Sequence, residues 1–439
     1  MSSEKFQFPT VTAVVIANMI GTGVFTSLGF QLLEIQSGFV ILMLWAVGGV
    51  VALCGAMTYA ELGAAFPRSG GEYNFLSRIY HPAVGFVGGW TSATIGFSAP
   101  TALVAMTFAA YGTSILDLRD ARMLEQIVAI GLIAVLAAVH AGRRRTSGGM
   151  QIILTALKVA VIVLFCGSVF LLMDSPQPIR FLPVSGDAAL LTSSAFAVSL
   201  IYVSYSYTGW NAATYLSGEL ERPQQTLPWI LAAGTLVVTL LYVSLNFIFL
   251  YAAPVVELQG QIDVGFIAAV AAFGEAGGRF AGIILALLLI STVSAMLLAG
   301  PRVMQVIGED FPALGFLARR NRDGIPGTAI LIQAGLAVAF VLSSSFESVL
   351  LFAGFTLALN SFMTVAGVFL LRWRQPGLDR PYKTFLFPLP PLIYLALTGW
   401  TLFFVLKTRP VEGLFGLGVI GSGLVVYGLL QLGQRRGRA

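Results

Sequence analysis

Apolar stretches of about 20 residues recur along almost the whole chain, and only short polar segments separate them. A helix of that length can cross a hydrocarbon core of roughly 30 Å. Hydrophobic residues make up 57% of the chain and charged residues only 10%, whereas about a quarter of a soluble domain is charged. The sequence therefore predicts an all-α polytopic membrane protein that forms one helical bundle.

We expect about twelve transmembrane helices from the hydropathy of the sequence. The expected spans are residues 10–33, 39–66, 82–111, 124–141, 150–173, 190–217, 227–252, 279–307, 326–345, 348–371, 385–406 and 411–433. An even number of crossings places both termini on one side of the membrane. The basic residues of the connecting segments indicate which side that is.

When the termini are taken as cytoplasmic, 18 of the 25 lysines and arginines fall in cytoplasmic segments. Only six fall in external segments, namely Arg119, Arg122, Arg180, Arg279, Lys407 and Arg409. We therefore expect a multi-pass protein of the cell membrane (inner or plasma membrane) with cytoplasmic N- and C-termini. The basic loops face anionic lipid, so the net charge of +5 does not indicate a nucleic acid partner.

The first span contains Gly21-Thr22-Gly23 at its centre, and the sixth contains Tyr205-Ser206-Tyr207-Thr208-Gly209. A glycine destabilises a helix interior by about 1 kcal/mol relative to alanine, so both helices are expected to be broken. Spans one and six correspond if spans 1–5 and 6–10 form two inverted repeats. Interrupted helices at corresponding positions of two repeats indicate the binding site of a transporter.

A broken helix offers backbone groups to a ligand. The first residues of the second half-helix carry partial positive charge, and the last residues of the first half-helix carry partial negative charge. A carboxylate can therefore bind the N–H groups of Thr22, Gly23 and Val24, and an ammonium can bind the carbonyls near Ile20 and Tyr205. Neither break contains a side chain that is charged at neutral pH, so a zwitterion with a neutral side chain fits best.

Two other interpretations apply to these glycines. Gly21 and Gly23 can simply allow close packing between helices, which is common in membrane proteins, and for either break alone packing is the favoured interpretation. The matched pair, with polar residues around both breaks, favours a binding site instead. A dinucleotide-binding fingerprint fits poorly, because the third glycine and the preceding strand are missing.

Three motifs extend the pattern over the chain: Gly21-Thr22-Gly23-Val24-Phe25; Tyr59-Ala60-Glu61-Leu62-Gly63 with Phe66-Pro67-Arg68-Ser69-Gly70-Gly71-Glu72-Tyr73; and Tyr207-Thr208-Gly209-Trp210-Asn211 with Gly218-Glu219 and Pro223 to Pro228. With these motifs the chain resembles the amino acid–polyamine–organocation (APC) superfamily, in particular bacterial L-type amino acid transporters. The resemblance implies a LeuT-like fold with a 5+5 inverted repeat. The repeats would cover residues 1–173 and 190–371, and two additional helices would cover residues 385–433.

The resemblance also implies a substrate-binding set, which consists of Ile20, Gly21, Thr22, Gly23, Val24, Tyr205, Ser206 and Thr208. Tyr205 matches the family's gating aromatic, which covers the substrate from outside; the alternative is an aromatic packed at a kink. Thr208 stands where animal L-type members have glycine. We therefore expect a smaller side-chain pocket and small substrates such as alanine, serine or threonine.

Lys158 lies about eight residues into the fifth span, at a depth of roughly 12 Å. A charge at the membrane centre costs roughly 2.5–3.5 kcal/mol on insertion scales, unless the side chain snorkels to the headgroups. The resemblance implies a lysine that replaces a sodium ion between helices 1 and 8. Its expected partners are the Gly21 carbonyl and a hydroxyl of Ser291 or Ser294, so transport is expected to need no sodium.

Other polar residues have more ordinary interpretations. Glu61, Glu72 and Glu219 lie near the inner ends of their spans and are expected to pair with arginines such as Arg68 and Arg222. The two cysteines lie in apolar stretches, so they predict neither a disulfide nor a metal site. The animal relatives bind a heavy subunit through a cysteine between helices 3 and 4. Residues 112–123 contain no cysteine, so we expect no disulfide-linked partner.

The expected function is sodium-independent secondary transport of small neutral L-amino acids by alternating access, with the substrate and the lipid bilayer as partners. Exchange, proton coupling and facilitated diffusion all remain open. An amine or polyamine carrier is an alternative that would need acidic side chains near the breaks. A non-transporting amino acid sensor on the same fold and a membrane-embedded enzyme are alternatives from other classes. The sequence contains no hydrolase or nucleotide-binding motif, so we expect no catalytic residue, metal or cofactor.

Overall fold

The computed structural model describes residues 6–118, 122–142, 148–321 and 325–436. These residues form helices, and the only β-type pairing among them is a single bridge between Phe6 and Leu220. The prediction of an all-α fold is therefore confirmed. Some basic residues that were counted for the orientation lie outside the described residues, namely Lys5, Arg119, Arg143, Arg144, Arg145, Arg322 and Arg438.

The long helices follow the expected spans closely. They are α1 (Phe8–Met19) with α2 (Gly23–Gln31), α3 (Gly38–Ala65), α5 (Pro82–Thr91) with η1 (Ser92–Gly96) and α6 (Ser98–Ile115), α7 (Arg122–Gly142), α8 (Gly148–Leu172), α10 (Ser194–Ser206), α11 (Pro223–Ala252), α13 (Val264–Asp310), α14 (Gly327–Ser343), α15 (Phe346–Arg374), α16 (Leu389–Thr408) and α17 (Pro410–Arg436). Ten such helical segments are long and apolar enough to cross a membrane, while α10 and α14 are shorter apolar helices. The described residues therefore contain the twelve apolar elements that the sequence predicts.

Short helices connect these elements. They are α4 (Glu72–Ile79), α9 (Asp187–Leu191), η2 (Ala212–Glu219), α12 (Val255–Leu258) and η3 (Pro312–Ala318). The eighth span was expected at residues 279–307, and α13 includes that segment. Gly274 has a non-helical backbone, with φ 70° and ψ 179°, so α13 consists of two helices that meet at a kink there. The segment after the second break is the 3-10 helix η2, which begins at Ala212.

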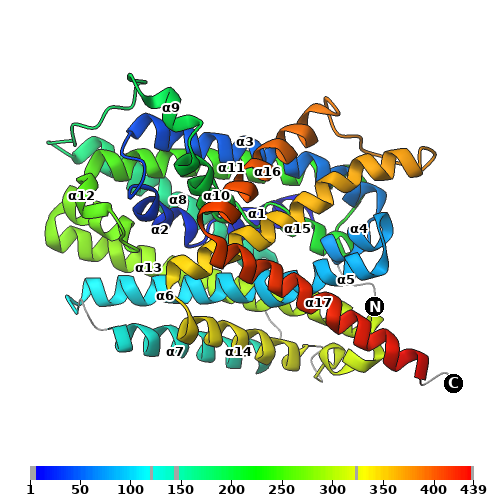
Figure 1. The fold of residues 1–439 in the computed structure, drawn as a ribbon. Helices are drawn as coiled ribbons and strands as arrows, with labels where there is room; N and C mark the ends of the chain where they lie inside the picture. Colours follow the sequence, from blue (N-terminus) through cyan, green and yellow to red (C-terminus); the bar gives the residue numbers. More distant parts are fainter. Residues whose placement is uncertain (1–5, 119–121, 143–147, 322–324, 437–439) are drawn as a thin grey trace.

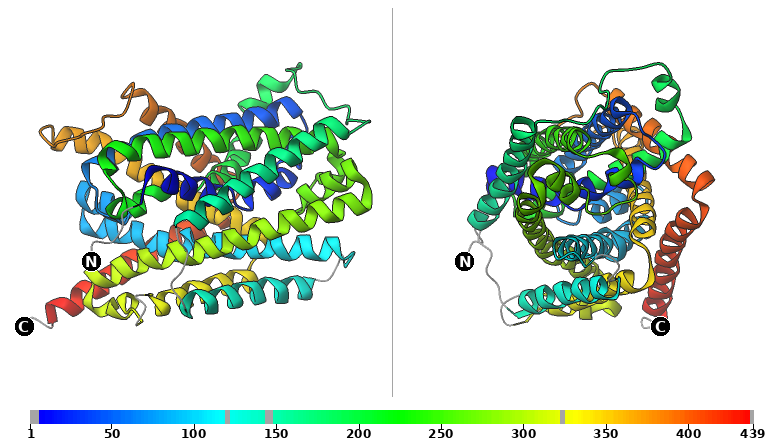
Figure 2. Two further views of the ribbon diagram at one scale, coloured as in Figure 1. Left: turned by 180° about the vertical axis from the view of Figure 1, so that it is seen from behind. Right: turned by 90° about the vertical axis from the view of Figure 1, so that its left-hand side faces the viewer.

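The start of α1 and the end of α17 lie at one end of the bundle together with α4, whereas α9 and α12 lie at the opposite end (Figures 1 and 2). We call these the α4 end and the α9 end. An even number of crossings places the first and last helix ends on the same side, because each crossing takes the chain from one end of the bundle to the other. The basic residues of the sequence favour the α4 end as the cytoplasmic one.

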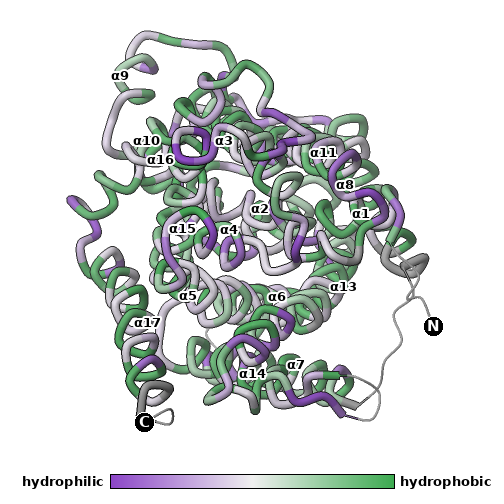
Figure 3. The backbone as a smooth tube through the Cα atoms, turned by 90° about the vertical axis from the view of Figure 1, so that its right-hand side faces the viewer, coloured by the Kyte–Doolittle hydropathy of each residue, from purple (hydrophilic) through white to green (hydrophobic). Residues whose placement is uncertain are grey.

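The broken first helix occupies the centre of the bundle. In the most apolar window of residues 8–31, 78% of the residues are buried, compared with 17% for α7 and for α17. Around it, α1 packs against α8 and α11, and α2 packs against α10. Figure 3, which looks at the bundle from the α4 end, shows hydrophobic residues along the outer helices α7, α14 and α17. Apolar outer faces are what contact with lipid requires.

A buried ion pair fastens the α4 end of the bundle. The Glu61 side chain is fully buried and accepts hydrogen bonds from Arg372 Nε at 2.9 Å and Nη2 at 2.7 Å. The backbone N–H of Thr384 donates to the same carboxylate at 2.7 Å. The prediction that Glu61 pairs with Arg68 or Arg222 is therefore wrong, because a helix distant in sequence supplies its partner. Arg68 instead pairs with Asp310 at 3.0 Å, and the side chain of Glu219 lies outside the described atoms.

Candidate functional site

Both expected helix breaks are present in the described residues. The first lies between Met19, the last residue of α1, and Gly23, the first residue of α2. The second separates Ser206, the last residue of α10, from η2. Gly209 in this second break has a φ of 102°, and a Cβ there would lie 2.8 Å from the carbonyl carbon of Asn18. The missing side chain at Gly209 therefore allows the second break to pack directly on α1.

The two breaks also touch each other at Gly23. A Cβ added to Gly23 would lie 2.7 Å from the Cα of Ser206, which is too close for any side chain. Ser206 Oγ donates to the Tyr202 carbonyl at 2.7 Å and lies 3.2 Å from Ser27 Oγ of α2. Gly21 is less confined, because its added Cβ would have an ordinary contact of 3.7 Å with Thr292. The packing interpretation of the glycines thus applies to Gly23, at the point where the two broken helices meet.

The start of α2 has the backbone arrangement expected for an anion site. Gly23 and Val24 are its first residues, so their N–H groups have no acceptor within the helix. The N–H of Phe25 donates to the Thr22 carbonyl at 2.9 Å, and Thr22 Oγ1 is hydrogen-bonded to Thr107 Oγ1 of α6. Thr22, Gly23 and Val24 are all buried. Binding of a carboxylate by these groups remains a prediction.

Lys158 of α8 reaches the first break with its ammonium group. Its Nζ donates to the Ile20 carbonyl at 3.1 Å and to Thr292 Oγ1 of α13 at 2.9 Å. The residue is only 3% exposed, so the side chain does not snorkel to the membrane surface. Lys158 therefore connects the first break to two neighbouring helices, as the sequence led us to expect, although through different atoms.

The expected partners of Lys158 need correction at both ends. The carbonyl is that of Ile20 rather than Gly21, and the hydroxyl is that of Thr292 rather than Ser291 or Ser294. A helix turns by about 100° per residue, so residues one before and two after Thr292 point away from α8. Ser291 Oγ donates to the carbonyl of Leu288 at 2.7 Å, and Ser294 Oγ lies 2.8 Å from His140 Nε2.

The carbonyls that were expected to hold a substrate ammonium already have donors. The Ile20 oxygen accepts from Lys158 and, at 3.5 Å, from Thr292 Oγ1. The Tyr205 oxygen accepts from the N–H of Thr208 at 2.9 Å and from its Oγ1 at 2.6 Å. A carbonyl oxygen has two lone pairs, so the Tyr205 carbonyl has no acceptor site left for an ammonium in this arrangement. Lys158 occupies one site of the Ile20 carbonyl, and the single Thr292 proton is shared between Ile20 and the Leu288 carbonyl at 3.4 Å.

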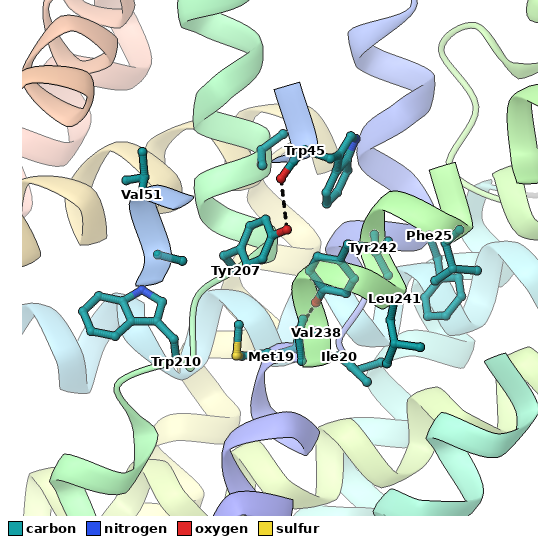
Figure 4. Packing of buried hydrophobic residues seen from close by; sticks show 14 of the residues in the cluster. Met19, Ile20, Phe25, Trp45, Val51, Tyr207, Trp210, Val238, Leu241 and Tyr242 are labelled. Carbon is teal, nitrogen blue, oxygen red and sulfur yellow. Dashed lines mark hydrogen bonds between the residues drawn. The ribbon is translucent and has the colours of Figure 1, made fainter. Parts of the chain in front are cut away.

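Tyr242 of α11 is a residue that the sequence analysis missed. Its hydroxyl lies between the last carbonyls of the two half-helices, and it is hydrogen-bonded to the Met19 oxygen and to the Ser206 oxygen, the latter at 2.9 Å. Figure 4 shows its ring beside Tyr207 and close to Met19 and Ile20. A buried tyrosine in a span has no distinctive sequence signal, so only the fold reveals this bridge between the breaks.

A cavity of about 110 Å³ extends from the breaks toward the α4 end. Its wall includes Asn18 of α1, Glu72 of α4, Ser92 of η1, Arg302 of α13, and Thr208 and Trp210 of the second break. Of the expected substrate-binding residues only Thr208 lines it, while the others lie beside it in the packed breaks: Ile20, Gly21, Thr22, Gly23, Val24, Tyr205 and Ser206. η1 is a π-helix, an irregularity that often occurs at functional sites.

Aromatic residues close the α9 end of the site. Tyr205, the expected gate, is 4% exposed and belongs to a buried cluster with residues of α15. One turn nearer the α9 end, Phe30 stacks between Tyr202 and Phe346, with ring centroids 5.9 Å apart in both pairs. The Tyr202 hydroxyl donates to Glu347 at 2.9 Å. The aromatic cover thus includes Phe30 and Tyr202, which the sequence analysis did not single out.

Comparison with known proteins agrees with this arrangement. A family model described as "Amino acid permease" matches residues 6–416, so the chain belongs to the amino acid permease family. It is 27% identical to the serine/threonine exchanger SteT of Bacillus subtilis, over 94% of both chains. It is 26% identical to Asc-type amino acid transporter 1 of Mus musculus and 28% identical to large neutral amino acids transporter small subunit 2 of Mus musculus. These two alignments each cover 94% of this chain and 78% of the relative.

The Lys158 contacts predict a specific pattern of transport defects. Thr292→Val removes the hydroxyl but keeps the shape of the side chain, and we expect it to lower amino acid uptake roughly fivefold or more, because a buried donor loses its partner. Thr292→Ser keeps the hydroxyl and should transport at near the wild-type rate. Lys158→Ala should fold and transport poorly. Uptake of amino acid into liposomes measures each effect, and Ser291→Ala is the matched control. An equal loss of uptake in Ser291→Ala contradicts the assignment of Thr292 as the partner of Lys158.

The contact between the breaks predicts opposite outcomes for two neighbouring glycines. Gly23→Ala inserts a methyl group against the Ser206 backbone, so it should abolish uptake or prevent folding. Gly21→Ala makes only an ordinary contact with Thr292 and should retain most of the uptake. Folded yield by size-exclusion chromatography and uptake by the reconstituted protein test both variants. Similar behaviour of the two would show that the breaks do not pack as described.

Proposed function

We propose that this amino acid permease is a sodium-independent secondary transporter of small neutral L-amino acids, which works by alternating access. The observation that carries the proposal is the meeting of two broken helices at Gly23 and Ser206, next to a cavity whose lining residues extend toward the α4 end. Broken helices at corresponding positions are the binding sites of such transporters. The carboxylate of the substrate would bind the first N–H groups of α2, at Thr22, Gly23 and Val24.

Alternating access needs a side that is closed and a side that is open. The aromatic stack of Phe30, Tyr202 and Phe346 covers the site toward the α9 end, and the cavity extends toward the α4 end. With cytoplasmic termini, this arrangement corresponds to a transporter open to the cytoplasm. We assign the two inverted repeats to residues 1–173 and 190–371 as part of the same proposal, because one repeat moving against the other would reverse the open side.

Lys158 supports independence from sodium. Its ammonium lies between a carbonyl of the first break and a hydroxyl of α13, and oxygen atoms of these kinds are the ligands that a sodium ion prefers. The lysine supplies an ammonium group there, which is covalently part of the chain. The break in helix 1 is thus held in place without a bound ion.

Thr208 supports a preference for small side chains. It lines the cavity, and its Oγ1 is held against the Tyr205 carbonyl at 2.6 Å. Two of the relatives have names that agree with a neutral substrate, namely the serine/threonine exchanger and the large neutral amino acids transporter subunit. The threonine methyl group narrows the cavity beside the second break, which favours alanine, serine and threonine over leucine or phenylalanine.

A carrier of amines is the second candidate, because the structure brings an acidic side chain into the cavity. Glu72 lines it together with polar residues of the second break. Arg302 lines the same cavity, so its wall carries both signs of charge. A zwitterion matches two opposite charges better than an amine does, which is why we prefer an amino acid as the substrate.

Reconstitution of the purified protein into liposomes tests the proposal. We expect uptake of labelled L-alanine in buffers without sodium, and no increase when a sodium gradient is applied. Uptake that requires internal amino acid establishes exchange, and uptake that follows a pH gradient establishes proton coupling. A strict requirement for sodium, or no uptake of any neutral amino acid, contradicts the proposal. Preferred uptake of an amine such as ethylamine establishes the second candidate instead.

The size preference predicts an effect of changes at Thr208. Thr208→Gly enlarges the cavity beside the second break, so we expect inhibition of alanine uptake by leucine and phenylalanine to become stronger by about tenfold. A methylene group in a hydrophobic pocket changes discrimination by roughly 10–200-fold. Thr208→Ser keeps the hydroxyl and most of the volume and is the matched control. Unchanged inhibition in Thr208→Gly would remove Thr208 from the determinants of specificity.

A further inference from the structure

Glu72 is a buried carboxylate at the wall of the cavity. It is the first residue of α4 and is 2% exposed. Its Oε1 accepts hydrogen bonds from the Tyr59 hydroxyl at 3.0 Å and from Asn211 Nδ2 at 2.6 Å, and its Oε2 accepts one from the Tyr215 hydroxyl. The expectation that Glu72 pairs with Arg68 is wrong, because Arg68 pairs with Asp310.

The donors that reach Glu72 spread its negative charge but do not cancel it. All three are neutral groups, two phenol hydroxyls and one amide. A carboxylate has about four acceptor sites, so one site on Oε2 remains after these bonds. A buried charge in the membrane region is costly unless a charge of opposite sign lies near it. The neighbouring Glu61 illustrates this rule, since Arg372 binds it with two hydrogen bonds.

A cation can reach this carboxylate from the cavity. Its volume of about 110 Å³ far exceeds the roughly 10–15 Å³ that one water molecule needs, so it can hold a small organic solute. Ser92, Trp210 and Tyr215 lie on its wall with Glu72. Meanwhile, the Tyr205 carbonyl already accepts two hydrogen bonds from Thr208, and Lys158 binds the Ile20 carbonyl. An acceptor elsewhere along the path would therefore serve the ammonium group.

We propose that Glu72 forms an ammonium-binding subsite in this cavity, which holds the α-ammonium of the substrate as it passes between the helix breaks and the α4 end. The subsite rests on the proposed transport function and names a second position for the substrate within it. Arg302 also lies on this wall, so the cavity lining carries both signs of charge. The ligand class is a small molecule with a primary ammonium group.

The subsite also connects substrate binding to the second break. Asn211 and Tyr215 belong to the break and to η2, and both donate to Glu72. Tyr59 belongs to α3. An ammonium at Glu72 therefore adds its charge to a cluster that joins α3, α4 and the segment after α10. When the subsite is occupied, it stabilises the segment after α10 in the position seen in the structure.

The decisive experiment compares the two faces of the membrane. The KM for L-alanine is measured from the α4 end in inverted vesicles and from the α9 end in whole cells, for the wild type and for Glu72→Gln. We expect the KM at the α4 end to rise roughly tenfold, because a charge-assisted hydrogen bond is lost, while the KM at the α9 end stays within about twofold. Glu309→Gln removes an exposed carboxylate at the same end and should change neither value. An equal change on both faces, or no change, overturns the proposal.

A second measurement does not depend on the folding of the variant. In inverted vesicles containing the wild-type protein, ethylamine, which keeps the ammonium group, should inhibit alanine transport from the α4 end. Propionate, which keeps only the carboxylate, should not inhibit. Neither compound should inhibit from the α9 end. Inhibition by propionate alone, or equal inhibition by ethylamine on both faces, overturns the subsite.

The failure of the transport proposal would be recognised separately. If the wild-type protein takes up no neutral amino acid, ethylamine is added to the purified protein and the melting temperature is measured. Ethylamine should then raise the melting temperature of the wild-type protein and of Glu309→Gln but not that of Glu72→Gln. This result supports the subsite even if no neutral amino acid is transported. No rise with the wild-type protein overturns the subsite whatever the transported substrate is.

Discussion

The ammonium of Lys158 is the interaction on which the rest of the site depends. A break in a membrane helix exposes backbone groups that find no water in the bilayer core, so each must be satisfied by protein. Lys158 satisfies the Ile20 carbonyl and at the same time binds Thr292. The end of α1 is thereby fixed against α8 and α13, and α2 can begin at Gly23, where it packs against Ser206 of the second break.

The second break depends on the first through one hydroxyl group. Tyr242 lies between the Met19 and Ser206 carbonyls, but a phenol has only one proton to donate. It can therefore satisfy one of the two carbonyls at any moment, and the other must rely on a weaker contact. Met19 has an additional donor in the N–H of Gly21, at 2.7 Å. In the described residues the Ser206 carbonyl therefore depends on Tyr242, whose hydroxyl lies 2.9 Å from it.

The sequence predicts those features that depend on local composition. It does not predict contacts that depend on how a helix is rotated about its own axis. Hydropathy locates the spans, and the glycines around Thr22 and Gly209 locate both breaks, because each signal lies within a few residues. The depth of Lys158 indicates a buried cation, but the choice of Thr292 over Ser291 depends on how α13 is turned toward α8. Tyr242 and Glu72 reach the site only through packing of distant elements, so no local pattern distinguishes them from other buried tyrosines and glutamates.

Two carboxylates in the same motif show how the partner determines the role. Glu61 and Glu72 are both buried near the α4 end. Arg372 and Thr384 satisfy Glu61 from α15 and the segment after it, and removing one member of such a pair leaves an uncompensated charge that costs about 3–5 kcal/mol. Glu61 is therefore committed to holding the helices together. Glu72 has only neutral donors and faces the cavity, so its charge stays available to a ligand that the protein binds and releases.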